Sequence, residues 1–297
     1  MAVGNPGGTP DEPLGPRTEL DGRTVPVVGP EVVDEATPIR ARGLALPSDW
    51  SRWAAPLISF VLIVAAWQAL VVIARLPRFI LPAPDAVFAA FVGQFPLLLS
   101  NTWVTLLETL AGFFLSIVVA VPLAILISSS SALRNGIYPF LLLGQSVPKQ
   151  AIAPLLLLWL GYGDGPKVVL AFLTAFFPIV VNTAIGLQMT PPEMLDLARL
   201  LSASRWRVFA KVTFPAAMPY FFAGLKVAIS LAIVGAVIGE FIGADRGLGQ
   251  MIVLFSANQR TDIAFAAIAM LSLLGIALFA LISLAERVVC PWYDKAS

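Results

Sequence analysis

Histidine is absent from the 297-residue sequence, and cysteine occurs once, at Cys290. Without an imidazole and with one thiol, the chain has no Ser-His or Cys-His nucleophile pair and no Cys/His set for a zinc site. A single cysteine also excludes a disulfide within the chain. We therefore expect no catalytic residues of these kinds, no bound metal and no cofactor.

Charged residues are also scarce. Charged residues make up 12% of the chain, against roughly 25% in an ordinary soluble domain, whereas 58% of the residues are hydrophobic. The net charge of +1 shows no basic excess of the kind that favours nucleic-acid binding. This composition excludes a disordered chain, argues against a water-soluble enzyme and indicates a membrane protein.

The few charged residues are concentrated at the amino-terminal end. Residues 1–52 hold thirteen of them, together with eight of the 24 prolines and seven of the 22 glycines. Such a segment cannot bury enough apolar surface to offset the entropy lost on ordering. We predict a disordered tail over residues 1–52, with a docking or regulatory role left open, a membrane domain over residues 53–293 and a short tail over residues 294–297.

Long apolar runs fill most of the remaining chain. A helix needs about 20 mostly apolar residues to cross a bilayer. Five runs reach this length, namely Ala54–Ile73, Trp103–Ile127, Val168–Leu187, Tyr220–Ile242 and Ile263–Leu284. A sixth run, Ile137–Leu160, is interrupted in its middle by polar residues and prolines. The sequence thus predicts an all-α membrane protein with six transmembrane helices, one of which is interrupted.

Six spans place both termini on one side of the membrane, and the basic residues indicate which side. If the termini are cytoplasmic, ten Lys and Arg residues near the span ends lie inside and five lie outside. Because cytoplasmic loops carry an excess of Lys and Arg, we predict a multi-pass protein of the plasma (inner) membrane with both termini in the cytoplasm.

The long cytoplasmic loop, residues 188–214, lies between the fourth and fifth spans. Thr190 and Glu193 have the spacing of a capping box, and Ser204 is suited to cap a second short helix. Two short amphipathic helices at this place form either a docking surface for a partner or a hairpin lying on the lipid, with its basic residues near anionic headgroups. The residue pattern alone does not decide between the two.

The same loop carries a motif: Asp196-Leu197-Ala198, then Ser202, then Val212-Thr213-Phe214-Pro215. This spacing resembles the "EAA" loop of permease subunits of bacterial ATP-binding-cassette importers. Residues 148–155 and 240–249 are similar to the same family, and the resemblance covers about residues 53–293. It points to the branch of permeases for nitrate, sulfonates and taurine and for pyrimidine-type vitamin precursors.

The resemblance implies that this loop is a coupling helix seated in a groove of a separate ATPase subunit. The chain has no G-x-x-x-x-G-K-[ST] phosphate loop, so it is not itself that ATPase. Asp196 and Ser202 stand where the family has Glu and Gly, so the turn at Ser202 must avoid a left-handed conformation or accept strain. The residues expected to contact or position the ATPase are Asp196, Ala198, Arg199, Ser202, Arg205 and Pro215.

Ionisable and polar groups inside the membrane are costly, and each requires a role. Lys149, beside Pro148 in the interrupted span, either faces the translocation pathway or pairs with a carboxylate or carbonyl and holds the break in the helix. Glu240 is a pathway group, an outer gate or a side chain extended to the interface. The residues we expect along the pathway are Gln145, Lys149, Gln150, Asn182 and Glu240.

Three further features belong to the fifth span and the segment after it. Lys226 is expected to extend its ammonium group to the membrane interface. Gly235, Gly239 and Gly243 mark either a subunit interface or close packing within one chain. The short apolar run Leu248–Phe255 is expected at the outer face, as part of a gate, as a docking helix or as a plain interfacial helix.

By resemblance, then, the chain is a permease subunit and not an enzyme. Its expected substrate is a small polar or anionic solute such as nitrate, a sulfonate or taurine, with a pyrimidine-type vitamin precursor as the alternative. The expected partners are an ATP-binding cassette ATPase subunit, an extracytoplasmic substrate-binding protein, a second permease copy and membrane lipid, with no nucleic acid. The alternative class is an ion-coupled secondary transporter, which would require an internal repeat and a buried carboxylate relay.

Overall fold

The computed structural model describes residues 17–20, 23–26 and 50–292. The chain separates into two units, residues 1–58 and residues 59–297.

The described part of the first unit includes a short strand pair. Strands β1 (Arg17–Leu20) and β2 (Arg23–Pro26) run antiparallel, with Arg17 opposite Pro26. The sequence did not predict this pair. The rest of the tail expected to be disordered, up to residue 49, lies outside the described residues, as do residues 293–297.

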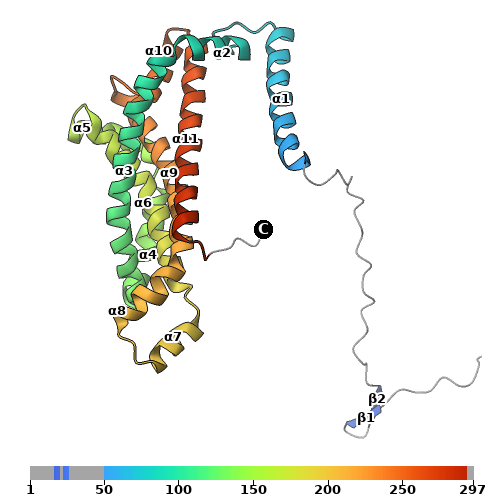
Figure 1. Cartoon of the computed structure of the whole chain (residues 1–297), viewed down its shortest axis with the longest axis vertical. Coiled ribbons are helices and arrows are strands. Elements are labelled where there is room, and N and C mark those ends of the chain that lie inside the picture. Colours follow the sequence, from blue (N-terminus) through green and yellow to red (C-terminus); the bar gives the residue numbers. More distant parts are fainter. Residues whose placement is uncertain (1–16, 21–22, 27–49, 293–297) are drawn as a thin grey trace, which may run out of the picture. The chain divides into compact units, whose positions relative to one another are not determined.

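Helices dominate the described chain from residue 50 onward (Figure 1). In chain order they are α1 (Trp50–Ile73), α2 (Pro84–Gly93), α3 (Phe95–Ser129), α4 (Ser131–Ser146), α5 (Lys149–Leu160), α6 (Asp164–Gln188), α7 (Pro192–Leu200), α8 (Arg205–Val208), the π-helical turn η1 (Phe209–Thr213), α9 (Phe214–Gly243), α10 (Leu248–Ala257) and α11 (Thr261–Val289). Among the described residues, five segments are long and apolar enough to cross a membrane, and α4 with α5 makes a sixth if that bent pair is one span. The predicted all-α membrane fold is confirmed.

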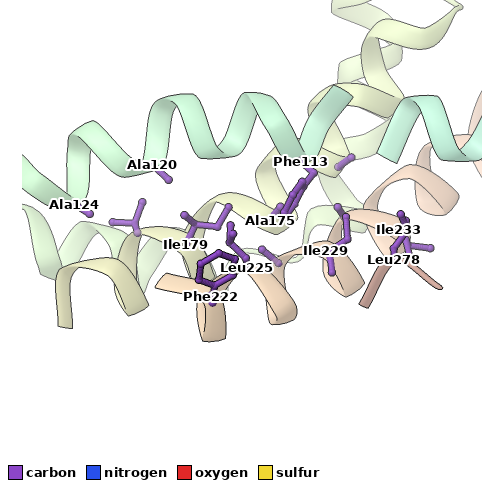
Figure 2. Packing of buried hydrophobic residues seen from close by; sticks show 14 of the residues in the cluster. Phe113, Ala120, Ala124, Ala175, Ile179, Phe222, Leu225, Ile229, Ile233 and Leu278 are labelled. Carbon is purple, nitrogen blue, oxygen red and sulfur yellow. The ribbon is translucent and has the colours of Figure 1, made fainter. Parts of the chain in front are cut away.

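The core of the second unit is built on α6 and α9, which pack against each other and against α3, while α11 packs on α9. Figure 2 shows Phe113 and the alanines of α3 facing Ile179 of α6 and the apolar face of α9. Lipid is as apolar as this core, so burial alone does not hold the helices together. Small residues such as Ala120 and Ala175, both fully buried, let the backbones approach closely.

The spaced glycines of α9 belong to this internal packing. A Cβ added at Gly239 would lie 2.8 Å from the Cα of Lys167, and one added at Gly235 would lie 2.8 Å from the Cα of Ala171. Both contacted residues are on α6. Gly243, in the next turn, faces the Leu157 side chain of α5 instead. In the described chain these three glycines therefore serve close packing between helices of one subunit.

A buried ion pair joins α9 to α11. The ammonium group of Lys226 bonds to the carboxylate of Glu286, and both side chains are largely buried. The prediction that Lys226 extends to the membrane interface is therefore wrong. The sequence could not show this pairing, because the two residues are 60 positions apart.

Candidate functional site

A cavity of about 520 Å³ lies between α4, α5, α6 and α9. Four of the five residues expected along the pathway line it: Gln145, Lys149, Gln150 and Asn182. They come from three different helices, so it is the fold that brings them together. Among the described lining residues, Lys149 is the one charged group, and no carboxylate is present.

The break between α4 and α5 places the first three of these residues on the cavity wall. Pro148 has no amide hydrogen and disfavours helical backbone at the residue before it. Val147 is accordingly extended, with φ −69° and ψ 125°, and the two helices meet at an angle of 89°. Gln145 thus ends one helix while Lys149 and Gln150 begin the next, and all three face the same space.

Lys149 has contacts that correspond to both of its expected roles. Its Nζ donates a hydrogen bond to the carbonyl oxygen of Gln145 at 2.5 Å, in the last turn of α4, where a cation is favourable. The same ammonium group lies 5.2 Å from the ring centroid of Phe177, which is a cation–π distance. The Lys149 side chain therefore both bonds across the helix break and lines the cavity.

The opposite walls of the cavity come from α6 and α9. Asn182 lines it from α6, with its Nδ2 donating to the carbonyl oxygen of Pro178 at 2.9 Å. From α9 comes an apolar stripe at helical spacing, made of Val227, Leu231, Val234 and Ile238. The cavity therefore has one polar and cationic side and one aliphatic side.

Glu240, the fifth expected pathway residue, does not line this cavity. Its side chain is fully buried on another face of α9. Thr105 Oγ1 donates to Glu240 Oε1 at 2.6 Å, and the backbone amide of Gly249 donates to Oε2 at 2.5 Å. The carboxylate is thus engaged by α3 and by the start of α10 and does not extend to the membrane interface.

A second buried charge cluster lies near Thr105. Lys167 Nζ is 2.5 Å from Glu108 Oε1 and 3.0 Å from Asp164 Oδ1, and the side chains of Lys167 and Glu108 are almost completely buried. This ion pair was not predicted from the sequence. The available signal was the helical spacing of Asn101, Thr105 and Glu108, which puts polar side chains on one face of an apolar helix.

The loop between α6 and α9 contains two short helices, as predicted. Ser204 caps the second one, because its hydroxyl accepts a hydrogen bond from the amide of Arg207 at 3.4 Å. The hydroxyl of Thr190 donates to the carbonyl oxygen of Leu187 at 3.4 Å, back toward α6. Ser202 has φ +49°, so of the two expected outcomes for this turn, the left-handed conformation is the one adopted.

Several large apolar side chains of this loop are exposed. Leu200, Leu201 and Trp206 are 82%, 72% and 75% exposed. The Trp206 ring stacks on Phe209, with ring centroids 5.7 Å apart. These exposed large apolar side chains lie close together in the sequence, which favours an interaction surface here.

The expected ATPase-contacting residues occupy different places around this surface. Asp196, Ser202 and Arg205 are exposed, and Pro215 is half-buried at the start of α9. Ala198 is buried, and its carbonyl oxygen accepts from the amide of Ala203 at 3.0 Å, which closes the turn at the end of α7. The side chain of Arg199 lies outside the described residues.

Residues 112–289 match the family described as the binding-protein-dependent transport system inner membrane component. The chain belongs to this family and is an ATP-binding-cassette transporter permease. It is 37% identical over 224 residues to a probable ABC transporter permease protein of Haemophilus influenzae, a match that spans 75% of this chain and 91% of the relative.

Two further relatives have more specific names. A riboflavin transport system permease of Chloroflexus aurantiacus is 34% identical, with 82% of this chain and 91% of the relative covered. A formylaminopyrimidine transport permease of Halalkalibacterium halodurans is 33% identical, with 81% and 96% covered.

The fold is also similar to that of a solved ABC transporter. A chain of the MetNI methionine ABC transporter, solved in an inward-facing conformation, matches with a TM-score of 0.59 and 18% identity over 66% of this chain and 98% of that one. The fold is therefore that of an importer permease.

Proposed function

We propose that this chain forms half of the translocation route of an ATP-driven importer, and that the cavity at the α4–α5 break is its part of the route. The observation that carries the proposal is the meeting of Gln145, Lys149, Gln150 and Asn182 at one cavity. Discontinuous helices at such a site supply polar groups to a substrate at membrane depth.

The energy source in this proposal is a separate ATPase subunit docked on the surface of α7 and α8. Leu200, Leu201 and Trp206 supply an apolar patch, and Asp196 and Arg205 supply exposed charges beside it. ATP-driven closure of two ATPase subunits draws two such loops together and rocks the spans, so that the route opens outward. Hydrolysis returns it to the inward-facing state.

The cavity favours a neutral or anionic solute with several hydrogen-bonding groups. Lys149 brings a positive charge and Phe177 brings an aromatic face, while Gln145, Gln150 and Asn182 bring amide donors and acceptors. A planar heterocycle such as a flavin or a pyrimidine uses all of these groups, and the named relatives at 34% and 33% identity support this class. A small anion such as a sulfonate is the second candidate, because it needs chiefly the Lys149 cation.

The assembly proposed here has two permease copies, two ATPase subunits and an extracytoplasmic substrate-binding protein, in the plasma (inner) membrane. Both termini lie in the cytoplasm in this proposal, which the uneven distribution of basic residues supports. A second copy is required because one chain contributes a cavity open to its surroundings, not an enclosed channel.

The substrate route is tested by uptake in cells that lack other routes for the solute, with radiolabelled riboflavin and a radiolabelled aminopyrimidine as probes. Lys149→Met removes the cation and should reduce uptake at least about tenfold, the equivalent of roughly 1.4 kcal/mol, whereas Lys149→Arg should retain part of it. Ser272→Ala is the control, because its exposed hydroxyl bonds to Ile268 of its own helix. Full uptake by Lys149→Met at equal expression would refute the proposed route.

A further inference from the structure

Side chains from other helices accept hydrogen bonds from the first amides of α10. The amide of Gly247 donates to Asn101 Oδ1 at 2.8 Å, that of Leu248 to Thr105 Oγ1 at 2.9 Å, and that of Gly249 to Glu240 Oε2 at 2.5 Å. The first amides of a helix have no partner within it. Gly247, in the capping position, has no side chain to satisfy them, so α3 and α9 provide the acceptors for these three amides.

Thr105 connects the three contacts into one network, which we call the α10 clasp. Its hydroxyl accepts from the Leu248 amide and donates to Glu240 Oε1 at 2.6 Å, so one side chain joins α3, α9 and α10. Asn101 lies one turn earlier on the same face of α3. The clasp therefore consists of the side chains of Asn101, Thr105 and Glu240 together with the amides of residues 247–249.

Two glycines at the start of α10 leave space for the buried carboxylate of Glu240. A Cβ on Gly249 would lie 2.7 Å from Glu240 Oε2, and a Cβ on Gly247, which has φ +120°, would overlap the same carboxylate. Glu240 is fully buried, so the Gly249 amide and the Thr105 hydroxyl supply hydrogen bonds that its carboxyl group would otherwise make to water.

The clasp lies between the cavity and the outer surface. On α9, Ile238 lines the cavity only two residues before Glu240. Beyond the clasp, a pocket of about 310 Å³ is formed by α3, α10 and the segment between α9 and α10, including the exposed Asp245 and Arg246. Neither of these two charged side chains has an ion-pair partner among the described residues.

We propose that the clasp makes α10 a rigid outward extension of α3 and α9, with Glu240 as the positioning residue. In this proposal α10 keeps its position relative to α3 and α9 during transport and does not open and close as a gate. Movement of the cavity wall is carried through Glu240 to the outer pocket and its charges at Asp245 and Arg246. This inference rests on the proposed function, because it assigns the clasp a part in the same transport cycle.

The test measures whether α10 moves relative to α3. Spin labels replace Leu97 on α3 and Leu254 on α10, both of which line the outer pocket and are partly exposed. The native Cys290 is buried, and burial, with the nearby Glu286 carboxylate, raises the pKa of its thiol, so this thiol reacts slowly and Cys290→Ser removes its remaining reactivity toward the label. The spin–spin distance is recorded for the assembled transporter in lipid nanodiscs, without nucleotide and with ATP plus orthovanadate.

The expected result is one narrow distance distribution that is the same in both states. Thr105→Val, which keeps the shape but loses the hydroxyl, and Glu240→Gln, which leaves one acceptor oxygen where the carboxylate has two, should broaden the distribution in both states. Thr105→Ser should restore it. Asn258→Ala, at the other end of α10 with its Nδ2 bonded to Leu254, is the matched control and should leave the distribution narrow.

Two results would overturn the inference. One is a distance that changes on ATP and orthovanadate addition with the clasp intact, which would make α10 a mobile gate. The other is a distribution that stays narrow in Thr105→Val and Glu240→Gln variants that still assemble with the ATPase. Failure of the Lys149 uptake test would refute the route and leave the distance unaffected, so the two proposals fail separately.

Discussion

Ser202 shows how a single residue position can be set by the turn it occupies. The Ala203 amide bonds to the Ala198 carbonyl oxygen, and Ser202 between them is left-handed at φ +49°. This is the arrangement in which helices usually end on glycine. A side chain in left-handed backbone costs roughly 1–2 kcal/mol, so the turn at the end of α7 is strained.

Ser202→Gly should therefore stabilise the turn by about 1 kcal/mol. We expect slower amide exchange in residues 198–204 and no loss of ATPase-coupled transport. Exchange is followed by mass spectrometry on the protein in nanodiscs, with Ser129→Gly as the control for adding a glycine where the backbone is helical. Faster exchange in the Ser202→Gly variant would show that the serine contributes more than its backbone strain costs.

The residues of the candidate site differ in how visible they are in the sequence. Gln145, Lys149 and Gln150 lie within six residues around a proline in an apolar run, which is a local signal for a break that exposes polar groups. Glu240 has no such signal, because Thr105, which donates to it, is 135 residues away. Its burial could not be predicted before the packing of α3, α9 and α10 was known.

At the scale of elements, α8 and the turn η1 present the most exposed large aromatic side chain of the α6–α9 loop. Trp206 is 75% exposed and held flat by stacking on Phe209. Exposed tryptophans that become buried in a partner commonly contribute 2 kcal/mol or more to binding. The patch formed by Leu200, Leu201 and Trp206 should then dominate the attachment of the ATPase.

Trp206→Ala should weaken ATPase attachment at least about tenfold, the equivalent of 1.4 kcal/mol. The measurement is ATPase recovered with affinity-tagged permease over a series of ATPase concentrations. Trp159→Ala is the matched control, since Trp159 is 67% exposed on α5 and does not belong to the loop. Equal recovery with both variants would contradict docking on this surface.

The presence of each span was predictable, because a long apolar run is rarely anything other than a membrane helix. The residues at which the helices begin and end were not. The second span was expected to begin at Trp103, whereas α3 begins at Phe95. The polar residues in between, Ser100, Asn101 and Thr102, each bond to a carbonyl oxygen of their own helix. Polar side chains satisfied in this way do not end a helix, and Asn101 is needed there for the α10 clasp.

Across the whole second unit, three regions of interest lie at different positions along the helices. The loop of α7 and α8 offers an apolar docking surface, the α4–α5 break opens a cavity beside α6 and α9, and the clasp fixes α10 at the far ends of α3 and α9. Because α9 lines the cavity, carries Glu240 of the clasp and continues directly from the loop through η1, we expect movement in one region to reach the others through this helix. The family and the fold could be inferred from the sequence motif, but this arrangement could not, since it depends on contacts between distant residues.

Whether the cavity is the transport route is tested by the chemical accessibility of a cysteine placed at position 182. In the Cys290→Ser background, Asn182→Cys places a thiol on the cavity wall, and Thr183→Cys places one on the adjacent, buried position. Modification by a membrane-impermeant maleimide is timed in the assembled transporter, without nucleotide and with ATP plus orthovanadate. We expect the Asn182→Cys variant to react from the cytoplasmic side without nucleotide and from the outer side in the trapped state, while the Thr183→Cys variant stays unreactive. An Asn182→Cys variant that reacts identically in both states, or as little as Thr183→Cys, would show that the cavity is not the route.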